Sequence, residues 1–239
     1  MLKIIFVFLF SFSLFGCDGF GLSEPQHAVA SAHPVATQAG IDILNQGGNA
    51  FDAAVAVSAT LAVVEPYSSG MGGGGFWLLH SAKDKSDVMI DGREVAPLKA
   101  HRDMYLDKSG NVVPMLSITG PLSAGIPGQP AALVKINKEY GKLSLKEVLA
   151  PAIKAAQQGF KVSKHYQKMA RFRQEALQAS PAAAEIFLQD NKVPSIGYTI
   201  KQPDLANTLM AIAEQGVAGF YQGKVAEALV NGTQAAGGI

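Results

Sequence analysis

A glycine-rich stretch, read E-P-Y-S-S-G-M-G-G-G-G-F over residues 65–76, constrains the fold of this chain more than any other feature. Five of the six residues from Gly70 to Gly75 are glycines. Each glycine in regular structure costs roughly 0.5–1 kcal/mol relative to alanine, so this composition indicates a place that needs bare backbone. The need arises either from a sterically tight turn or from the close approach of a substrate or reacting centre. Composition leaves both open.

The same stretch contains the pattern G-x-G-x-x-G, which is typical of dinucleotide-binding folds. In those folds a strand precedes the glycines and a helix follows them, so that the pyrophosphate meets a helix N-terminus. Here we expect an apolar helix before the glycines and an apolar strand after them. No Gly-Lys-Ser/Thr follows either. This order argues against nucleotide binding.

Periodicity, capping residues and turn residues predict a helix-rich chain with a β-hairpin after the glycines. Asn49 is a good N-cap for a helix over 50–64 that has the acidic residue Asp52 in its first turn. This helix must be buried because it is apolar nearly all round. The expected strands are 76–81 and 88–91. The expected helices are 34 to the glycine pair at 47–48, 50–64, 130–140, 144–158, 163–178, 181–188, 203–215 and 220–230. Ser144 with Glu147 three residues later fits a capping box at the start of the helix over 144–158.

The first sixteen residues have the pattern of a bacterial signal peptide. Lys3 is followed by an apolar run of thirteen residues, which is too short to span a bilayer comfortably. The run ends in Leu-Phe-Gly-Cys at 14–17, which resembles a lipobox. We therefore expect residues 1–16 to be removed, Cys17 to be lipidated, and residues 17–27 to form a tether. The protein would be exported and anchored to the membrane, facing the periplasm or the outside of the cell.

Composition narrows the class of protein. Of the 239 residues 48% are hydrophobic and 16% charged, and the net charge is +1. Such a chain has ample material for a core, and it lacks the basic excess expected of a nucleic-acid-binding protein. We predict no nucleic-acid partner, no cofactor and no metal site.

Asp91-Gly92-Arg93-Glu94 lies just after the second predicted strand. A guanidinium group binds a carboxylate through two parallel hydrogen bonds, so Arg93 is a candidate substrate-binding residue. The alternative is a structural ion pair between Arg93 and a neighbour such as Glu94 or Asp91.

Several motifs in one order resemble the γ-glutamyltransferase family, also called γ-glutamyltranspeptidase or glutathione hydrolase. The matching stretches are A-V-A-S-A-H-P-V-A-T (28–37), Q-G-G-N-A-F-D-A-A-V-A (46–56), V-E-P-Y-S-S-G-M-G-G-G-G-F (64–76), D-G-R-E-V-A-P (91–97), T-G-P-L-S-A-G-I-P-G (119–128), Q-P-D-L-A-N-T-L (202–209), G-F-Y-Q-G (219–223) and A-G-G-I (236–239). They cover essentially everything after the leader.

The resemblance implies an α/β (α+β) fold, the αββα sandwich of N-terminal-nucleophile hydrolases. In this family a precursor cleaves itself into a large and a small chain, and the new N-terminal threonine of the small chain is the nucleophile. Residues 28–239 would be the first part of the large chain. We expect no catalytic residue among them, and no γ-glutamyl hydrolase activity from residues 1–239 alone. Arg93 matches the family arginine that binds the α-carboxylate of the substrate.

The implied activity is cleavage of the γ-glutamyl bond of glutathione and related compounds through an acyl-enzyme. The implied partners are this small-molecule substrate and the small chain of the same precursor. Two alternatives remain at this point. One is a non-catalytic lipoprotein that binds amino-acid carboxylates. The other is a related acylase on the same scaffold, either a cephalosporin acylase or an enzyme that processes poly-γ-glutamate.

Overall fold

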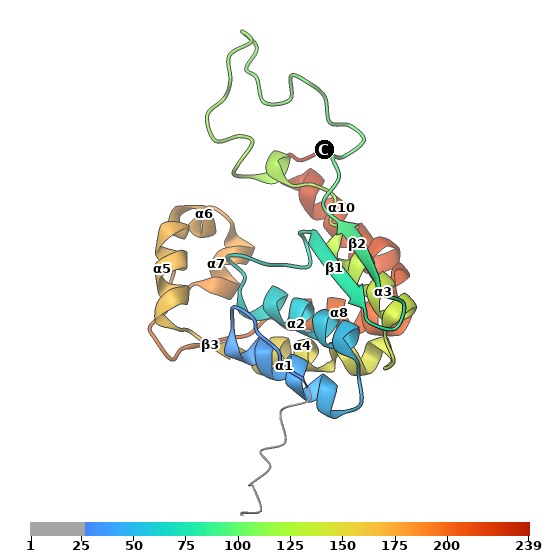
Figure 1. The fold of residues 1–239 in the computed structure, drawn as a ribbon. Coiled ribbons are helices and arrows are strands. Elements are labelled where there is room, and N and C mark those ends of the chain that lie inside the picture. The colour runs from blue at the N-terminus through green and yellow to red at the C-terminus, as the bar shows by residue number, and fades with distance from the viewer. Residues whose placement is uncertain (1–26) are drawn as a thin grey trace, which may run out of the picture.

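The structure, a computed structural model, describes residues 27–239 as helices packed around α2 with a β-hairpin beside them (Figure 1). The helices are α1 (Pro34–Asn45), α2 (Ala50–Val64), α3 (Gln129–Tyr140), α4 (Leu145–Gln158), α5 (Lys164–Phe172), α6 (Gln174–Gln178), α7 (Pro181–Phe187), α8 (Pro203–Gln215), α9 (Ala218–Tyr221) and α10 (Gly223–Ala235), with a short 3-10 helix at Pro121–Ser123. The strands are β1 (Gly75–Ser81), β2 (Ser86–Gly92), β3 (Phe160–Lys161) and β4 (Thr199–Ile200). This mixture of helices and strands confirms the predicted α/β class.

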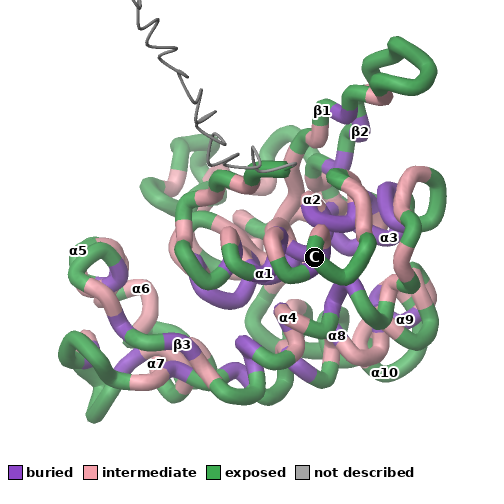
Figure 2. The backbone as a smooth tube through the Cα atoms, turned by 60° about the horizontal axis from the view of Figure 1, so that its bottom comes forward, coloured by how far each residue is buried: buried purple, intermediate pink, exposed green. Residues whose placement is uncertain are grey.

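Helix α2 is the centre of the core, as its apolar composition predicts. It contacts α1, α3 and α4, and Val55, Ala56 and Ala59 are fully buried. The buried segments of the backbone gather along this helix and α3 (Figure 2). Asn49 caps its first turn as expected, because its side-chain oxygen accepts hydrogen bonds from the N–H groups of Phe51 and Asp52 at 2.9 and 3.0 Å.

A buried carboxylate joins the start of α2 to the connection between α3 and α4. Asp52 is fully buried, and its Oδ2 accepts hydrogen bonds from the N–H groups of Asn49, Lys142 and Leu143 at 3.0, 2.9 and 3.3 Å. Its Oδ1 accepts a further bond from Asn137 Nδ2 at 3.1 Å. The sequence identifies Asp52 only as a first-turn acid, whereas the structure gives it four donors.

The hairpin of β1 and β2 has one buried and one exposed face, because side chains alternate along a strand. The strands are antiparallel, with Gly75 opposite Gly92 and Ser81 opposite Ser86. Leu79 and Ile90 lie in the core. On the other face Phe76, Leu78 and Met89 are 61%, 69% and 57% exposed. The predicted hairpin is confirmed, with each strand slightly longer than expected.

Helices α3, α4 and α8 complete the central packing. The predicted capping box of α4 is present, since Ser144 accepts a hydrogen bond from Glu147 N–H at 3.3 Å while Glu147 Oε2 accepts one from Ser144 N–H at 2.8 Å. Gln202, at the start of α8, donates a buried hydrogen bond from Nε2 to the carbonyl oxygen of Val63 at 2.8 Å. This bond ties α8 to the end of α2, beside the glycine-rich stretch.

Two predicted helices differ from the structure. The helix expected over 163–178 is broken at Arg173, whose backbone angles of −110° and 11° separate α5 from α6. The helix expected over 220–230 begins instead at Gly223, which has a φ of 59° and follows the extended residue Gln222. Phe220 belongs to the short helix α9. Periodicity misses these breaks because single-residue changes of backbone angle leave the apolar pattern almost unchanged.

Within residues 27–239 no helix is both long enough and apolar enough to cross a membrane. Cys17 and the predicted leader lie outside the residues that the structure describes.

Candidate functional site

The glycine-rich stretch is a sequence of tight turns between α2 and β1. The carbonyl oxygen of Glu65 accepts hydrogen bonds from the N–H groups of Ser68 and Ser69, both at 2.9 Å. The carbonyl oxygen of Gly73 accepts two more, from Gly128 and Gln129, both at 3.0 Å. These last two bonds attach the turn to the N-terminus of α3.

The glycines are needed for space rather than for an unusual backbone angle. None of the glycines from Gly70 to Gly75 has a φ in the left-handed region. A Cβ at Gly74 would overlap the carbonyl oxygen of Gly92 and lie 2.9 Å from the Cα of Arg93. A Cβ at Gly128 would overlap the carbonyl oxygens of Gly92 and Arg93. The backbone of Arg93 therefore lies between Gly74 and Gly128. Neither position has room for a side chain this close to it.

Gly72 differs from Gly74, because nothing lies within 4 Å of a Cβ placed at Gly72. The sterically tight turn, one of the two explanations that composition leaves open, therefore holds for Gly74. Gly74 serves close backbone packing, while Gly72 faces open space. Within residues 27–239 no packing contact requires a glycine at position 72.

Arg93 follows β2 directly and is fixed through its backbone. Its N–H donates a hydrogen bond to Asp91 Oδ1 at 3.0 Å. Its side chain is 57% exposed, and Nη1 lies 3.3 Å from Glu94 Oε2. An ion pair as exposed as this one contributes little to stability, about 0–1 kcal/mol. The ion pair to Glu94, which the sequence offers as the alternative to substrate binding by Arg93, is thus present. It leaves most of the Arg93 side chain accessible.

Arg93 and Glu94 line a small pocket with a volume of about 300 Å³ beside the glycine turn. Its other lining residues are Pro66, Tyr67, Ser68, Ser69, Gly70, Gly73, Gly74 and Gln129. Glu94 Oε2, the oxygen of the ion pair to Arg93, is buried and makes no hydrogen bond within the described residues. A guanidinium and a carboxylate surrounded by polar backbone suit a small zwitterion that carries both an acid and an amine.

The sequence identifies Arg93 and the glycines of this pocket but misses several of the other lining residues. Gln129 comes from the first turn of α3 and is brought in by the two hydrogen bonds to Gly73. Ser68 and Ser69 lie inside the glycine-rich motif. Their position between Glu65 and Gly70 is the sequence signal by which they could have been identified. None of the six threonines of the chain lines this pocket.

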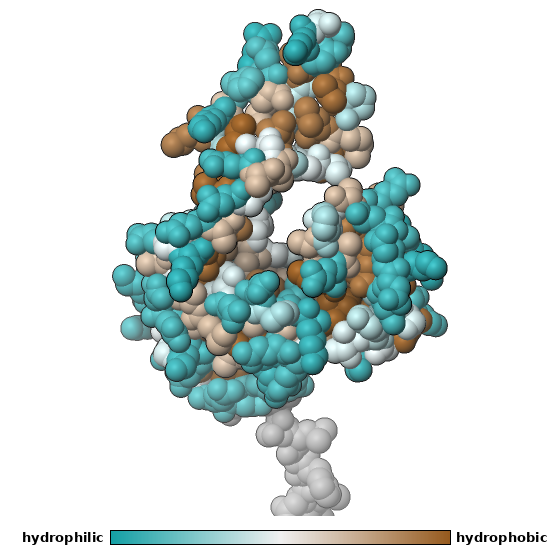
Figure 3. Space-filling model, turned by 180° about the vertical axis from the view of Figure 1, so that it is seen from behind, coloured by the Kyte–Doolittle hydropathy of each residue, from teal (hydrophilic) through white to brown (hydrophobic). Residues whose placement is uncertain are grey.

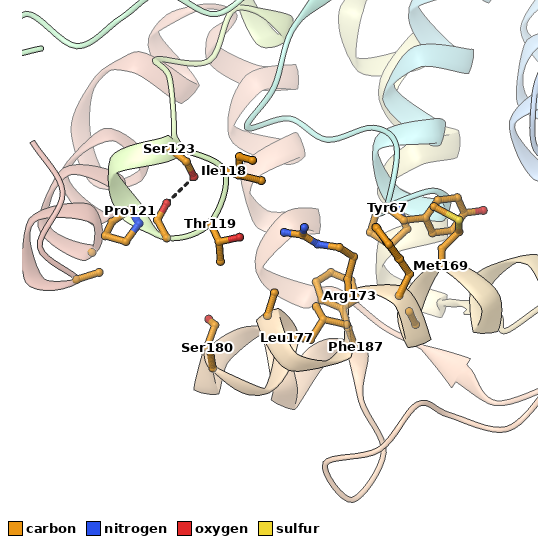
Figure 4. Close-up of a pocket in the computed structure, with 18 of the residues that line it drawn as sticks. Tyr67, Ile118, Thr119, Pro121, Ser123, Met169, Arg173, Leu177, Ser180 and Phe187 are labelled. Atoms are coloured by element: carbon orange, nitrogen blue, oxygen red, sulfur yellow. Dashed lines mark hydrogen bonds between the residues drawn. The ribbon is translucent and has the colours of Figure 1, made fainter. Parts of the chain in front are cut away.

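A second, larger cavity of about 1,040 Å³ adjoins the first and shares Pro66 and Tyr67 with it. Helices α5 to α7 form one side, with Met169, Leu177 and Phe187, and residues 118–123 form the other (Figure 4). The Arg173 side chain extends from the α5–α6 junction toward the side formed by Ile118 and Thr119 (Figure 4). In the view from the opposite face of the molecule, apolar side chains gather along one side of the hollow (Figure 3).

Among residues 27–239 there is no group of three or more His, Cys, Asp or Glu side chains placed to hold a metal ion.

Comparisons with known proteins agree with these motifs. The family model described as Gamma-glutamyltranspeptidase matches residues 36–239. The chain is 39% identical over 211 residues to a glutathione hydrolase proenzyme of Bacillus subtilis and 41% identical over 215 residues to one of Escherichia coli. These matches cover 88% and 90% of this chain but only 36% and 37% of the relatives. The chain therefore spans little more than a third of the length of these relatives.

A solved structure gives the same result for the fold. The crystal structure of Helicobacter pylori gamma-glutamyltranspeptidase superposes with a TM-score of 0.86 at 41% sequence identity. The superposition covers 89% of this chain and 61% of that chain. The predicted fold, the first part of an N-terminal-nucleophile hydrolase, is confirmed by this likeness.

Proposed function

The chain belongs to the gamma-glutamyltranspeptidase family, and from this premise we propose that the protein hydrolyses or transfers the γ-glutamyl group of glutathione and related compounds. The observation that carries the proposal is the pocket of Arg93. There an accessible guanidinium lies beside a carboxylate and bare glycine backbone, on the end of a strand held between Gly74 and Gly128. A γ-glutamyl group ends in an α-amino acid, whose charges this pocket complements.

Arg93 binds the α-carboxylate of the donor substrate in this proposal. A guanidinium fork pairs with a carboxylate through two hydrogen bonds and so fixes the direction of the bound group as well as its position. A strand end is a rigid mount for a group that must keep one geometry. The γ-carbonyl then points away from Arg93, toward a threonine nucleophile, and no threonine among residues 27–239 lines this pocket.

The nucleophile and the remaining pocket wall come from a small chain of the same precursor. The word proenzyme in the names of both curated relatives supports this proposal. In the described residues the hairpin also has an apolar face formed by Phe76, Leu78 and Met89. Exposed apolar surface of this kind marks a place that another element covers. We assign it to the second sheet of the αββα sandwich.

Incubation of the complete protein with glutathione tests the proposal. The expected result is the release of glutamate, or of a γ-glutamyl product when an amino acid or peptide is added as acceptor. Binding of glutamate without any turnover would instead favour the non-catalytic carboxylate-binding protein. Turnover of a cephalosporin side-chain amide but not of glutathione would favour the acylase.

Replacing Gly74 with alanine is expected to lower kcat/KM for glutathione at least tenfold. The new methyl group overlaps the Gly92 carbonyl oxygen, so the strand end that carries Arg93 must move, and displacements of about 1 Å cost up to about 100-fold in rate. Steady-state kinetics of the complete protein measures the effect. Gly72→Ala is the matched control, because its methyl group meets nothing within 4 Å. Equal losses in the two variants would contradict this explanation.

We also propose that the protein is a lipoprotein of the cell envelope. Leu14-Phe15-Gly16-Cys17 at the end of the apolar leader supports this proposal. Mass spectrometry of the mature protein is expected to find an N-terminal Cys17 that carries acyl chains. An unmodified Cys17, or a mature chain that begins near Ser31, would contradict it.

A further inference from the structure

Tyr67 lies in the wall that separates the pocket of Arg93 from the larger cavity. Its ring meets two rings from the first turn of α5. The ring centroids of Tyr67 and His165 are 5.2 Å apart, and those of Tyr67 and Tyr166 are 6.0 Å apart, both in edge-to-face geometry. Edge-to-face pairs at these distances are favourable beyond the area that they bury.

The partner ring on α5 is itself fixed. Tyr166 is 3% exposed, and its hydroxyl donates a hydrogen bond to the carbonyl oxygen of Phe187 at 3.0 Å. Its backbone N–H donates a further bond to the capping hydroxyl of Ser163 at 3.1 Å. Tyr67 therefore packs against a part of the fold that is held from two directions.

The other end of the Tyr67 side chain is tied to the turn itself. Its hydroxyl donates a hydrogen bond to Glu65 Oε1 at 3.3 Å, and Glu65 is 7% exposed. Burial and the neighbouring carboxylate raise the pKa of Tyr67 to about 12, so the phenol stays protonated and remains a donor at neutral pH. The same Glu65 accepts the two backbone hydrogen bonds that form the turn over 65–69.

This turn forms one side of the substrate pocket. Pro66, Ser68, Ser69 and Gly70 line the pocket together with Arg93 and Glu94. Arg93 is placed by β2 and its flanking glycines, whereas the turn is held to α5 through Tyr67. The width of the pocket thus depends on a contact made outside it.

We propose that Tyr67 is a positioning residue for the donor-substrate pocket, fastening the turn over 65–70 to α5 and so setting its separation from Arg93. The proposal rests on the proposed function for the identity of the substrate. It does not require Tyr67 to contact that substrate. A residue of this kind affects ground-state and transition-state binding alike, so its loss raises KM with little change in kcat.

The test compares Tyr67→Leu, Tyr67→Phe and Tyr140→Leu in the complete protein. Tyr140 is the matched control, since its ring pairs with Phe51 at 5.5 Å, at the end of α3 and the start of α2 that lie away from the pocket. We expect Tyr67→Leu to raise KM for glutathione about tenfold with kcat within about twofold, because both ring contacts are lost. Tyr67→Phe keeps the rings and loses only the bond to Glu65, so its KM is expected to rise about threefold.

Hydrogen exchange of the backbone amides over 65–75 is the second readout, and it does not depend on turnover. Exchange in this segment is expected to be faster in Tyr67→Leu and unchanged in Tyr140→Leu. Exchange equal to wild type in Tyr67→Leu overturns the proposal, and so does faster exchange with an unchanged KM. Should Tyr67→Leu fail to fold, the same two readouts on Tyr67→Phe decide. A wild-type protein that does not turn over glutathione would refute the proposed function, while exchange would still show whether Tyr67 holds the turn.

Discussion

Arg93→Lys is expected to lower kcat/KM for glutathione by about tenfold to 150-fold in the complete protein. Lysine keeps the charge but loses the planar fork, and one hydrogen bond to a charged group is worth about 1.5–3 kcal/mol. Each 1.36 kcal/mol corresponds to about tenfold in rate. Arg93→Ala is expected to lose more, and both variants should discriminate less against substrates without an α-carboxylate. Steady-state kinetics with glutathione and its decarboxylated analogue measures both effects.

Stability separates a substrate-binding role from a structural one. Arg93 is 57% exposed and its contact with Glu94 is a surface ion pair, so neither variant should change the thermal midpoint appreciably. Self-cleavage should also survive, because it needs no free carboxylate. Arg102→Lys is the control, as the Arg102 side chain is 97% exposed beside Asp103. Wild-type kcat/KM in an Arg93→Lys variant that folds and cleaves normally would reduce Arg93 to an ion-pair partner.

Asp52→Ala is expected to destabilise the fold by at least about 4 kcal/mol, since each of four donors left without an acceptor costs about 1–3 kcal/mol. The substitution removes the acceptor of three backbone N–H groups and of the Asn137 amide. Asp52→Asn keeps one acceptor oxygen and should lose roughly half as much. Denaturant unfolding followed by circular dichroism measures the change.

Asp42→Ala is the matched control for this effect. Asp42 is also an acid on a helix, and it accepts a hydrogen bond from Gln38 Nε2 at 2.7 Å on an exposed face. Surface substitutions of this kind usually change stability by no more than about 0.5 kcal/mol. A loss below about 1 kcal/mol in Asp52→Ala would show that water satisfies the donors and that the carboxylate does not hold the α3–α4 connection.

The sequence alone determined those features whose hydrogen bonds join residues a few positions apart. Asn49 and Ser144 begin helices through capping bonds to residues two or three positions later, and both were predicted correctly. Alternation of apolar residues was enough for the hairpin, because the period of two is local to each strand. The D-G-R-E motif placed Arg93 at a strand end, where it lies in the structure.

Tertiary structure alone decided how distant parts of the chain form the site. Gly74 and Gly128 close on either side of Arg93, Gln129 enters its pocket, and Tyr67 reaches α5. Asp52 receives the N–H of Lys142, 90 residues away. No local pattern encodes such pairs, because each depends on how α2, α3, α5 and β2 pack in three dimensions. The glycine content indicated that this stretch needs bare backbone. Only the fold showed that the missing side chain at Gly74 leaves room for the end of the strand that carries Arg93.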